Sequence, residues 1–416
     1  YRAKFGKARP PKPKSRIRDI TTDEKIGFQI IGIGPREKAM TGKQAQKGKL
    51  SERTLKHIEP AAPDGQVTTR VDAFSCDQWN NVISSFDDAL YDHTGVLAEA
   101  LRGHSRLSRF VVFRDNVAIG AAQLNIFRPL PGVRAGLAYA RYAPLWQRKD
   151  RRSDRADLRL TLQAMIRTYV VERGLQLTIL PQADPDHCAT VVYELERLGF
   201  RYRRDVFDNK HYIIDVALNP EEQRISLHHK WRYNLKQSLR NGIRIEIASG
   251  PRAVDDLMQL NRALCTRKGI VDRSWVNLFP KLYPQFAPAM RPTIVMAYHA
   301  GTPTAGVVIG RLGKTASDMF GGTDERALSL RAGYALQWWV INWLRQAGVA
   351  WYDLDADAIS PGLAQFKSGL VGKAGHILPL PGEYDYCGSD SSRVVAETIQ
   401  LIRSIRNTMR VMAGRP

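Results

Sequence analysis

Cysteine is scarce in this sequence, and the motifs of metal centres and common hydrolases are missing. The chain has four cysteines among its 416 residues, far apart and without a CxxC pair. This spacing argues against a zinc site or a disulfide framework and indicates reduced cytosolic thiols. No GxSxG, HExxH or P-loop pattern occurs either. We therefore expect no metal and no covalent hydrolase nucleophile.

Long hydrophobic runs are also absent. No apolar stretch approaches the roughly 20 residues of a membrane-spanning helix. No signal peptide is visible, although the chain begins at Tyr1 without methionine, so its true start can lie upstream. The hydrophobic content of 44% and the charged content of 25% are ordinary for a globular protein. These features predict a cytoplasmic protein without a transmembrane segment.

Acidic residues are too few to balance the basic ones. Lysine and arginine number 62 against 41 aspartates and glutamates, which gives a formal net charge of +21. Such a surface attracts polyanions, including nucleic acid, nucleotide-linked substrates and anionic lipid headgroups. The alternative is that much of the excess lies in a tail, because the first 66 residues are rich in Lys, Arg and Pro and lack an apolar period.

The globular pattern begins at Val67. Two apolar runs around Asp115 predict a β-hairpin, and an amphipathic helix that ends at Gly174 leads into a further strand. A second helix follows, and then a strand pair, near residues 201–206 and 211–216, that we expect to close this unit.

The second half repeats this order. A hairpin turns at Gly301, and a helix that ends at Gly348 again leads into a strand. We infer a tandem duplication of one α/β (α+β) unit, each a mixed twisted sheet flanked by helices, against the alternative of two unrelated α/β domains. The predicted parts are a basic tail (1–66), a first domain (67–225), a second domain (226–388) and a C-terminal amphipathic helix (389–416).

Two helices carry basic residues. Between the halves, Arg232, Lys236 and Arg240 recur every four residues and form one stripe, which is either an anion site or a solvated face. The C-terminal helix has apolar residues on one face and arginines elsewhere. Such a helix can lie on an anionic membrane surface, although it more often packs on its own domain. The residues predicted for its apolar face are Val395, Ile399, Ile402, Ile405, Met409 and Met412.

The stretch from Arg331 to Gly372 concentrates the candidate chemistry. It predicts a helix that is apolar nearly all round, a strand that ends in Asp353 and Asp355, and a short helix with Phe366 and Lys367. The two acids could orient or deprotonate an amine, cap the strand, or pair with the basic stripe. Lys367 would otherwise be a surface lysine at a helix C-terminus.

Six segments share their pattern with one known family: 140–146, 230–238, 321–325, 330–338, 351–354 and 362–370. They resemble the FemAB family of peptidoglycan interpeptide-bridge aminoacyltransferases, which belong to the GNAT-like acyltransferases. The resemblance implies two GNAT-like domains, in agreement with the repeat. The long helical-hairpin arm of well-known members has no room between Pro251 and Met290.

The resemblance also implies an activity. The expected reaction moves an aminoacyl group from aminoacyl-tRNA to an amine of a UDP-linked or lipid-linked muropeptide, without a cofactor and by direct attack of the amine. A fixed cation beside the carbonyl lowers the barrier of such an attack. The catalytic candidates are Lys367, Phe366, Asp353 and Asp355. The candidates for binding phosphate or substrate are Lys230, Arg232, Lys236, Arg240, Arg331, Tyr334 and Trp146.

Two other functions stay open. An acyl-CoA-dependent GNAT N-acyltransferase in polysaccharide or envelope synthesis would need the Arg/Gln-x-x-Gly-x-Gly/Ala motif that binds pyrophosphate. Here Leu330 stands at the Arg or Gln position before Gly333, so that motif is degraded. A protein that binds nucleic acid without catalysis, through its basic tail and stripe, is the second alternative.

Overall fold

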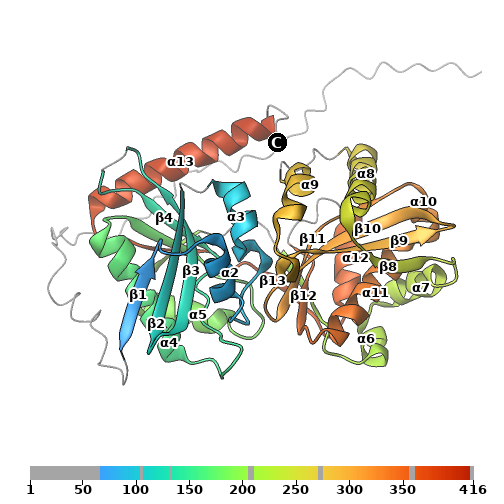
Figure 1. Cartoon of the computed structure of the whole chain (residues 1–416), viewed down its shortest axis with the longest axis horizontal. Coiled ribbons are helices and arrows are strands. Elements are labelled where there is room, and N and C mark those ends of the chain that lie inside the picture. The colour runs from blue at the N-terminus through green and yellow to red at the C-terminus, as the bar shows by residue number, and fades with distance from the viewer. Residues whose placement is uncertain are drawn as a thin grey trace, which may run out of the picture. The chain divides into compact units, whose positions relative to one another are not determined.

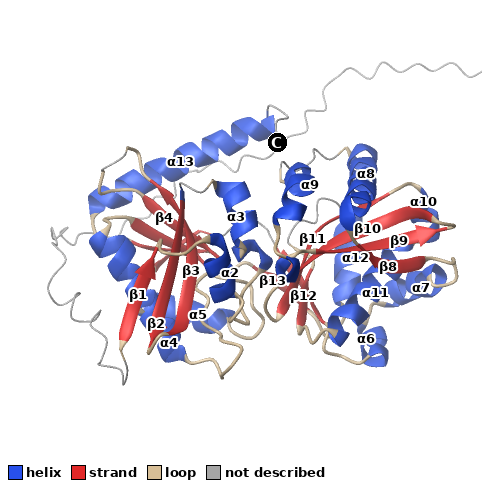
Figure 2. Ribbon diagram, in the orientation of Figure 1, coloured by secondary structure: helices blue, strands red, loops and turns tan. Residues whose placement is uncertain are grey.

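In the computed structural model of the chain, the residues described are 66–103, 106–130, 133–204, 210–269, 275–355 and 361–412. The predicted basic tail therefore lies outside the described residues, apart from Gln66. Two seven-stranded sheets, each with helices against it, make up the described part (Figures 1 and 2).

The first sheet is mixed. Its strands are antiparallel except for β4 and β5, which run parallel. The β2–β3 hairpin turns at Asp115 and Asn116, both in the left-handed region, as the Asp-Asn pair predicts. In spatial order the strands are β1 (Val67–Val71), β2 (Leu107–Arg114), β3 (Val117–Phe127), β4 (Leu137–Arg141), β5 (Gln176–Leu180), β14 (Glu383–Tyr386) and β6 (Arg201–Arg204).

The second sheet repeats this plan. Its parallel pair is β11 and β12, and the hairpin of β9 and β10 turns at Ala300 and Gly301. In spatial order the strands are β8 (Arg244–Ala248), β9 (Thr293–His299), β10 (Thr302–Arg311), β11 (Thr315–Thr323), β12 (Trp351–Asp353), β7 (Lys210–Asp215) and β13 (His376–Pro379). The matching order confirms the predicted tandem fold.

The halves exchange one strand each. β7 leaves the first half and lies between β12 and β13, whereas β14 leaves the second half and lies between β5 and β6. The prediction that residues 201–206 and 211–216 pair and close the first unit was wrong, because β6 and β7 belong to different sheets. Alternating apolar residues indicate that a strand forms but not which strand it pairs with.

Helices cover both faces of the second sheet. Val295 and Val307 face the core that contains α11, whereas the adjacent Ile294 and Val308 face the core under α8. This arrangement explains why β9 and β10 read as continuous apolar runs. The helices of the second half are α6 (Pro220–Ser226), α7 (His229–Ser238), α8 (Gly250–Lys268), α9 (Phe279–Leu282), α10 (Arg326–Leu330), α11 (Ala332–Gln346) and α12 (Pro361–Val371), with short turns η4 (Val276–Leu278), η5 (Tyr283–Gln285) and η6 (Pro288–Met290).

The first sheet packs against a long helix that changes type midway. α4 (Arg155–Met165) continues as the π-helical segment η3 (Ile166–Glu172), and Leu158, Leu162 and Tyr169 of this continuous helix are fully buried in the core. Gly174 follows with a positive φ, so the predicted helix end is confirmed. The remaining helices of this half are α2 (Cys76–Ile83), η1 (Tyr91–His93), α3 (Gly95–Arg102) and α5 (Cys188–Arg197).

The C-terminal helix α13 (Asp390–Met412) packs against β4 and β5 through its first turns. Ser392 and Ala396 are buried there, whereas Ile402 and Ile405 are 59% and 50% exposed. Of the predicted apolar face, Ile402 and Ile405 are therefore not packed against the domain in the described part of the chain. Among the described helices, none is long and apolar enough to cross a membrane.

Candidate active site

Lys367 is the centre of the candidate site. It lies on α12, and only 9% of the residue is exposed. Its Nζ donates hydrogen bonds to the carbonyl oxygens of Leu354 at 2.7 Å and Asp355 at 3.0 Å, and it lies 5.7 Å from the Tyr212 ring centroid. The alternative of a surface lysine at a helix end is therefore excluded. The result is an ammonium ion held by backbone dipoles in a buried place, where its field is weakly screened.

Three aromatic rings pack together beside this lysine. The Phe366 ring lies 5.0 Å from Tyr334 of α11 and 5.8 Å from Trp231 of α7, and the latter two are 4.9 Å apart. A Cβ on Gly369 would come within 3.0 Å of Trp231, so glycine lets α12 approach α7. These contacts bring together Phe366 and Tyr334, which the sequence placed in the site.

The two predicted acids share one short loop. Asp353 Oδ1 accepts a hydrogen bond of 2.9 Å from the amide of Asp355, which has a φ of 61°. Asp353 Oδ2 lies 2.6 Å from Nδ1 of His211 on β7. Asp353 therefore pairs with a histidine and not with the basic stripe of α7. Among the described residues, no cluster of three or more His, Cys, Asp or Glu could hold a metal ion.

His211 and its neighbours are residues that the sequence did not single out. Its Nε2 lies 3.5 Å from the hydroxyl of Tyr142, which accepts a hydrogen bond of 2.7 Å from Arg141. Burial lowers the pKa of His211, but the charge and hydrogen bond of Asp353 raise it, and the net pKa lies above 6.5. Tyr142 stood in a segment that carried the family resemblance, whereas nothing in the sequence marked His211.

A second polar group joins the partly buried Asp318 of β11 to the buried Gln337 of α11 and Tyr352 of β12. Gln337 Nε2 and the Tyr352 hydroxyl each lie 3.1 Å from Asp318 Oδ2, and the hydroxyl is 2.9 Å from Gln337 Oε1. The Gln337 amide can place one hydrogen on its single contact with Asp318, and the Tyr352 phenol has one hydrogen for its two contacts. Satisfying all three contacts therefore requires a proton on the carboxyl group of Asp318. Burial raises the pKa of Asp318 to about 6, although the Lys367 ammonium lowers it. No sequence motif indicated this group.

The basic residues of α7 do not act as one stripe. Lys230 reaches α12 and donates to Gln365 at 3.3 Å. Arg232 instead donates to the carbonyl oxygens of Ile225 and Leu227, at the C-terminal end of α6. Lys236 and Arg240 are exposed. The structure therefore places one of the four beside α12, uses one for local structure and leaves two to solvent.

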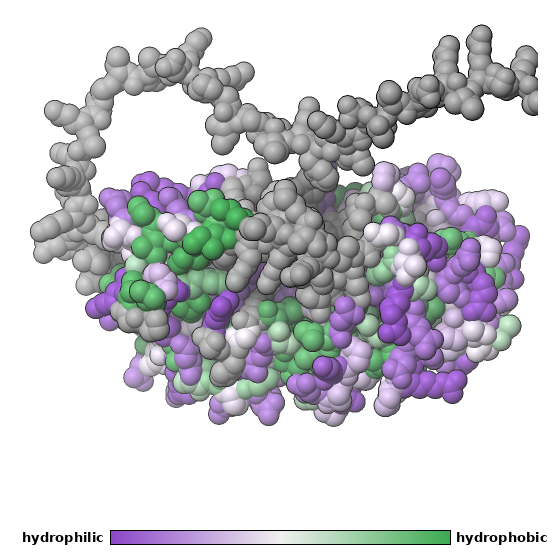
Figure 3. Space-filling view, turned by 90° about the horizontal axis from the view of Figure 1, so that it is seen from above, coloured by the Kyte–Doolittle hydropathy of each residue, from purple (hydrophilic) through white to green (hydrophobic). Residues whose placement is uncertain are grey.

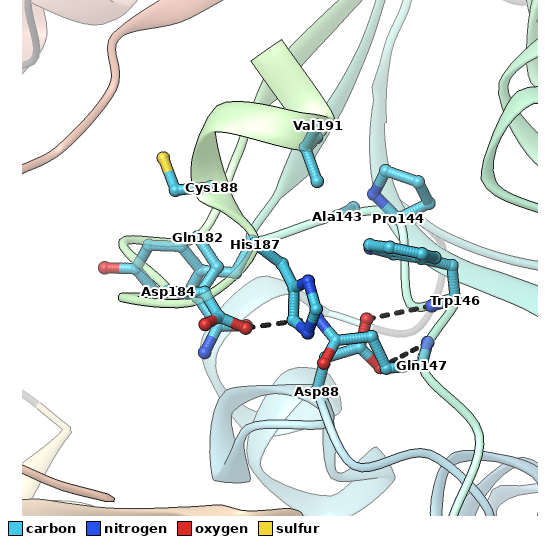
Figure 4. A pocket seen from close by; sticks show the side chains of 11 residues that line it. Asp88, Ala143, Pro144, Trp146, Gln147, Gln182, Asp184, His187, Cys188 and Val191 are labelled. Carbon is cyan, nitrogen blue, oxygen red and sulfur yellow. Dashed lines mark hydrogen bonds between the residues drawn. The ribbon is translucent and has the colours of Figure 1, made fainter. Parts of the chain in front are cut away.

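Arg331 and Trp146 lie in different settings. Arg331 precedes α11 with a φ of 53°, and its guanidinium lies 5.7 Å from the Tyr233 ring centroid. Trp146 is buried in the first half and lines a small recess with Asp88, Asp184 and His187 (Figure 4). Lys367 does not line this recess, so Trp146 is not grouped with the other predicted residues.

Comparisons with known proteins were made at the level of sequence and of structure. The model of the acetyltransferase (GNAT) domain matches residues 226–368. Comparison with the curated proteins gives no match. The crystal structure of FemX is similar with a TM-score of 0.62 and 14% identity, covering 76% of this chain and 97% of that one. A conserved protein of unknown function from Bacteroides thetaiotaomicron is similar with a TM-score of 0.53 and 11% identity, covering 77% and 99%.

Proposed function

We propose that this chain, which has a FemAB-like tandem GNAT fold with a GNAT acyltransferase domain, moves an aminoacyl group from aminoacyl-tRNA to an amine of a peptidoglycan precursor or related envelope acceptor. The observation that supports this most strongly is the buried ammonium of Lys367, held between two carbonyl groups. A fold alone does not assign a reaction, so the proposal depends on this site.

The site suits direct attack of an amine on an ester. Attack on the ester carbonyl forms a carbon–nitrogen bond and places negative charge on the carbonyl oxygen. That oxyanion is a stronger acceptor for Lys367 than the neutral carbonyl groups of Leu354 and Asp355. Lys367 therefore stabilises the transition state more than the ground state. The ester is already activated, so no covalent enzyme intermediate and no cofactor are needed.

The surroundings favour an aminoacyl-tRNA donor over acyl-CoA. The start of α11, where a GNAT protein would bind pyrophosphate, faces the aromatic group, because a Cβ on Gly333 would lie 3.9 Å from Phe366. Exposed Lys236 and Arg240, together with Lys230 and Arg331, are available for tRNA phosphates instead. Acyl-CoA remains the alternative donor.

The acceptor and the place of the reaction are part of the proposal. We assign the acceptor amine to a UDP-linked or lipid-linked muropeptide on the cytoplasmic side. Val394 and Leu401 of α13 are each 62% exposed, and the next residue to Val394 is the exposed Arg393, which also pairs with Asp390 at 3.3 Å. Exposed apolar residues on a helix that carries arginines suit peripheral contact with an anionic membrane. Figure 3 looks down on the face that carries α13 and shows hydrophobic residues gathered on it.

A transfer assay followed by mass spectrometry tests the proposal. Charged tRNAs and acyl-CoAs are offered as separate donors, with a UDP-linked muramyl pentapeptide as acceptor. We expect an RNase-sensitive gain of one aminoacyl mass on the peptide. Lys367→Met should lower kcat about 100-fold or more, as the loss of an oxyanion donor does.

Lys373 provides a matched control, because it is an exposed lysine just beyond the same helix. Lys373→Met should transfer at the wild-type rate. Mass gain only with acyl-CoA would move the protein to the CoA-dependent acyltransferases. Full activity of Lys367→Met would remove this residue from the mechanism. RNA binding without transfer to any acceptor would favour the non-catalytic alternative.

A further inference from the structure

Four polar side chains form a hydrogen-bonding series that joins the two halves. Tyr142 and His211 are buried, Asp353 is partly buried, and Arg141 is exposed. Arg141 and Tyr142 stand at the end of β4 in the first sheet, His211 on β7 and Asp353 at the end of β12 in the second. The successive contacts are 2.7 Å from Arg141 to the Tyr142 hydroxyl, 3.5 Å from that hydroxyl to His211 Nε2, and 2.6 Å from His211 Nδ1 to Asp353. The strand exchange is what brings His211 here, because β7 lies directly beside β12.

The donors and acceptors in this series of side chains fix the direction in which a proton can move. Arginine only donates, so the Tyr142 oxygen accepts from Arg141 and its own hydrogen is left for His211. The ionised Asp353 only accepts, so the hydrogen of the neutral imidazole lies on Nδ1 and Nε2 carries a lone pair. The hydroxyl of Tyr142 can therefore pass its proton to Nε2. The 3.5 Å separation is longer than a formed hydrogen bond, and catalytic hydrogen bonds often tighten when substrate binds.

The series of side chains ends at Asp353, in the loop that holds Lys367. Asp353 Oδ1 accepts a hydrogen bond from the amide of Asp355, and the carbonyl oxygen of Asp355 accepts one from Nζ of Lys367. Tyr142 and Asp355 both have left-handed φ angles, 56° and 61°. Tyr142 is held there by hydrogen bonds from its amide to the Leu180 carbonyl and from His93 to its own carbonyl. Such conformations cost about 1–3 kcal/mol each and occur often at functional sites.

We propose that Tyr142, His211 and Asp353 form a proton relay for acyl transfer, in which the Tyr142 hydroxyl contacts the acceptor amine. This inference rests on the proposed function. The acceptor nitrogen forms its bond to the carbonyl carbon and gives its proton to the Tyr142 oxygen, while Tyr142 gives its own to His211 Nε2. When the ester carbon–oxygen bond breaks, the same protons move back, and the leaving ribose oxygen takes one. Asp353 balances the charge of the transient imidazolium.

The relay differs from a purely structural link in its dependence on pH. A structural link would hold the halves together whatever the protonation of His211. In a relay, His211 must be neutral to accept, so kcat should fall as the pH drops below its pKa. The charged or titratable groups on elements around His211 are Asp353 at the end of β12 and Asp355 after it, Arg141 at the end of β4 and Tyr142 after it, Lys367 of α12 and His376 of β13.

The test is the dependence of kcat and KM on pH for the full chain. His211→Gln and Tyr142→Phe should lower kcat about 100-fold, in the range of general acid–base catalysis, with KM changed less than about threefold. Asp353→Asn should move the acidic limb of kcat to lower pH, because the carboxylate no longer raises the pKa of His211. His376→Gln is the matched control, since this histidine is half-buried on the neighbouring strand β13.

An NMR titration of the His211 ring keeps the relay testable apart from activity. The signal is assigned by its loss in His211→Gln. It should titrate above pH 6.5 in the wild type and at lower pH in Asp353→Asn, with both proteins folded. An active wild type whose His211→Gln variant keeps kcat and the acidic limb would overturn the relay and leave the proposed function intact. A change confined to KM would also overturn it. A wild type that transfers nothing would refute the proposed function instead.

Discussion

At the scale of single residues, the site combines one fixed cation, Lys367, with one partly buried acid, Asp318. Asp318 is hydrogen-bonded to Gln337 and Tyr352 and lies in the field of Lys367. Its pKa rises from 3.8 to about 6, so the folded state binds a proton more tightly than the unfolded chain. The stability that this proton contributes is complete below pH 3.8 and is lost as the pH rises through about 6.

Asp318→Asn should therefore stabilise the protein at neutral pH relative to the wild type. The difference in unfolding free energy should grow between about pH 4 and 6 and then level off near 3 kcal/mol, since each tenfold change in proton affinity is worth about 1.4 kcal/mol. Urea unfolding at several pH values measures this. Asp255→Asn, at an exposed position on α8, is the matched control for the loss of one carboxylate. A flat difference for Asp318→Asn would contradict the buried proton.

At the scale of elements, glycine sets how closely helix and sheet approach. A Cβ on Gly322 of β11 would lie 2.2 Å from the amide nitrogen of Asn261 on α8. Backbone atoms of a packed helix cannot yield as a flexible side chain can. Gly322→Ala should therefore destabilise the protein by about 3 kcal/mol, as overpacking does.

Gly362→Ala is the matched comparison, because among the described residues no atom beyond its immediate neighbours lies within 4 Å of the added Cβ, and the position is in the first turn of α12. It should be neutral or stabilise by up to about 1 kcal/mol, since alanine favours helix. Chemical denaturation of both variants measures the contrast. Equal stabilities would mean that α8 shifts without cost and that the close approach is unimportant.

The elements themselves could be predicted from local sequence, but their partners could not. The two hairpins, the helix ends at Gly174 and Gly348, and the sequence of helix, strand and helix around Lys367 follow from periodicity and glycine. The exchange of β7 and β14 depends on contacts between distant residues, which no local period records. For the same reason no local pattern marks His211 or Asp318 as site residues, whereas Phe366 and Lys367 are adjacent and form one recognisable motif.

At the scale of the whole molecule, the exposed apolar residues of α13 would be in contact with lipid if the protein works at a membrane. Leu401 and Ile405 are 62% and 50% exposed. Burying two such side chains in a bilayer is worth about 3 kcal/mol or more. Leu401→Asp combined with Ile405→Asp should therefore weaken binding to phosphatidylglycerol vesicles about 100-fold, measured by co-sedimentation, while transfer to a soluble UDP-linked acceptor is unchanged.

The chain offers a matched pair for this test. Leu328 on α10 and Ile225 on α6 are 62% and 58% exposed, and neither lies on α13. Their double replacement by aspartate adds the same charge and should leave vesicle binding nearly intact if α13 is the contact. Equal losses in the two double variants would mean that the aspartates act through net charge alone. Binding that is as strong on phosphatidylcholine as on phosphatidylglycerol would show that anionic lipid is not recognised, and no binding at all would leave α13 without a role at the membrane.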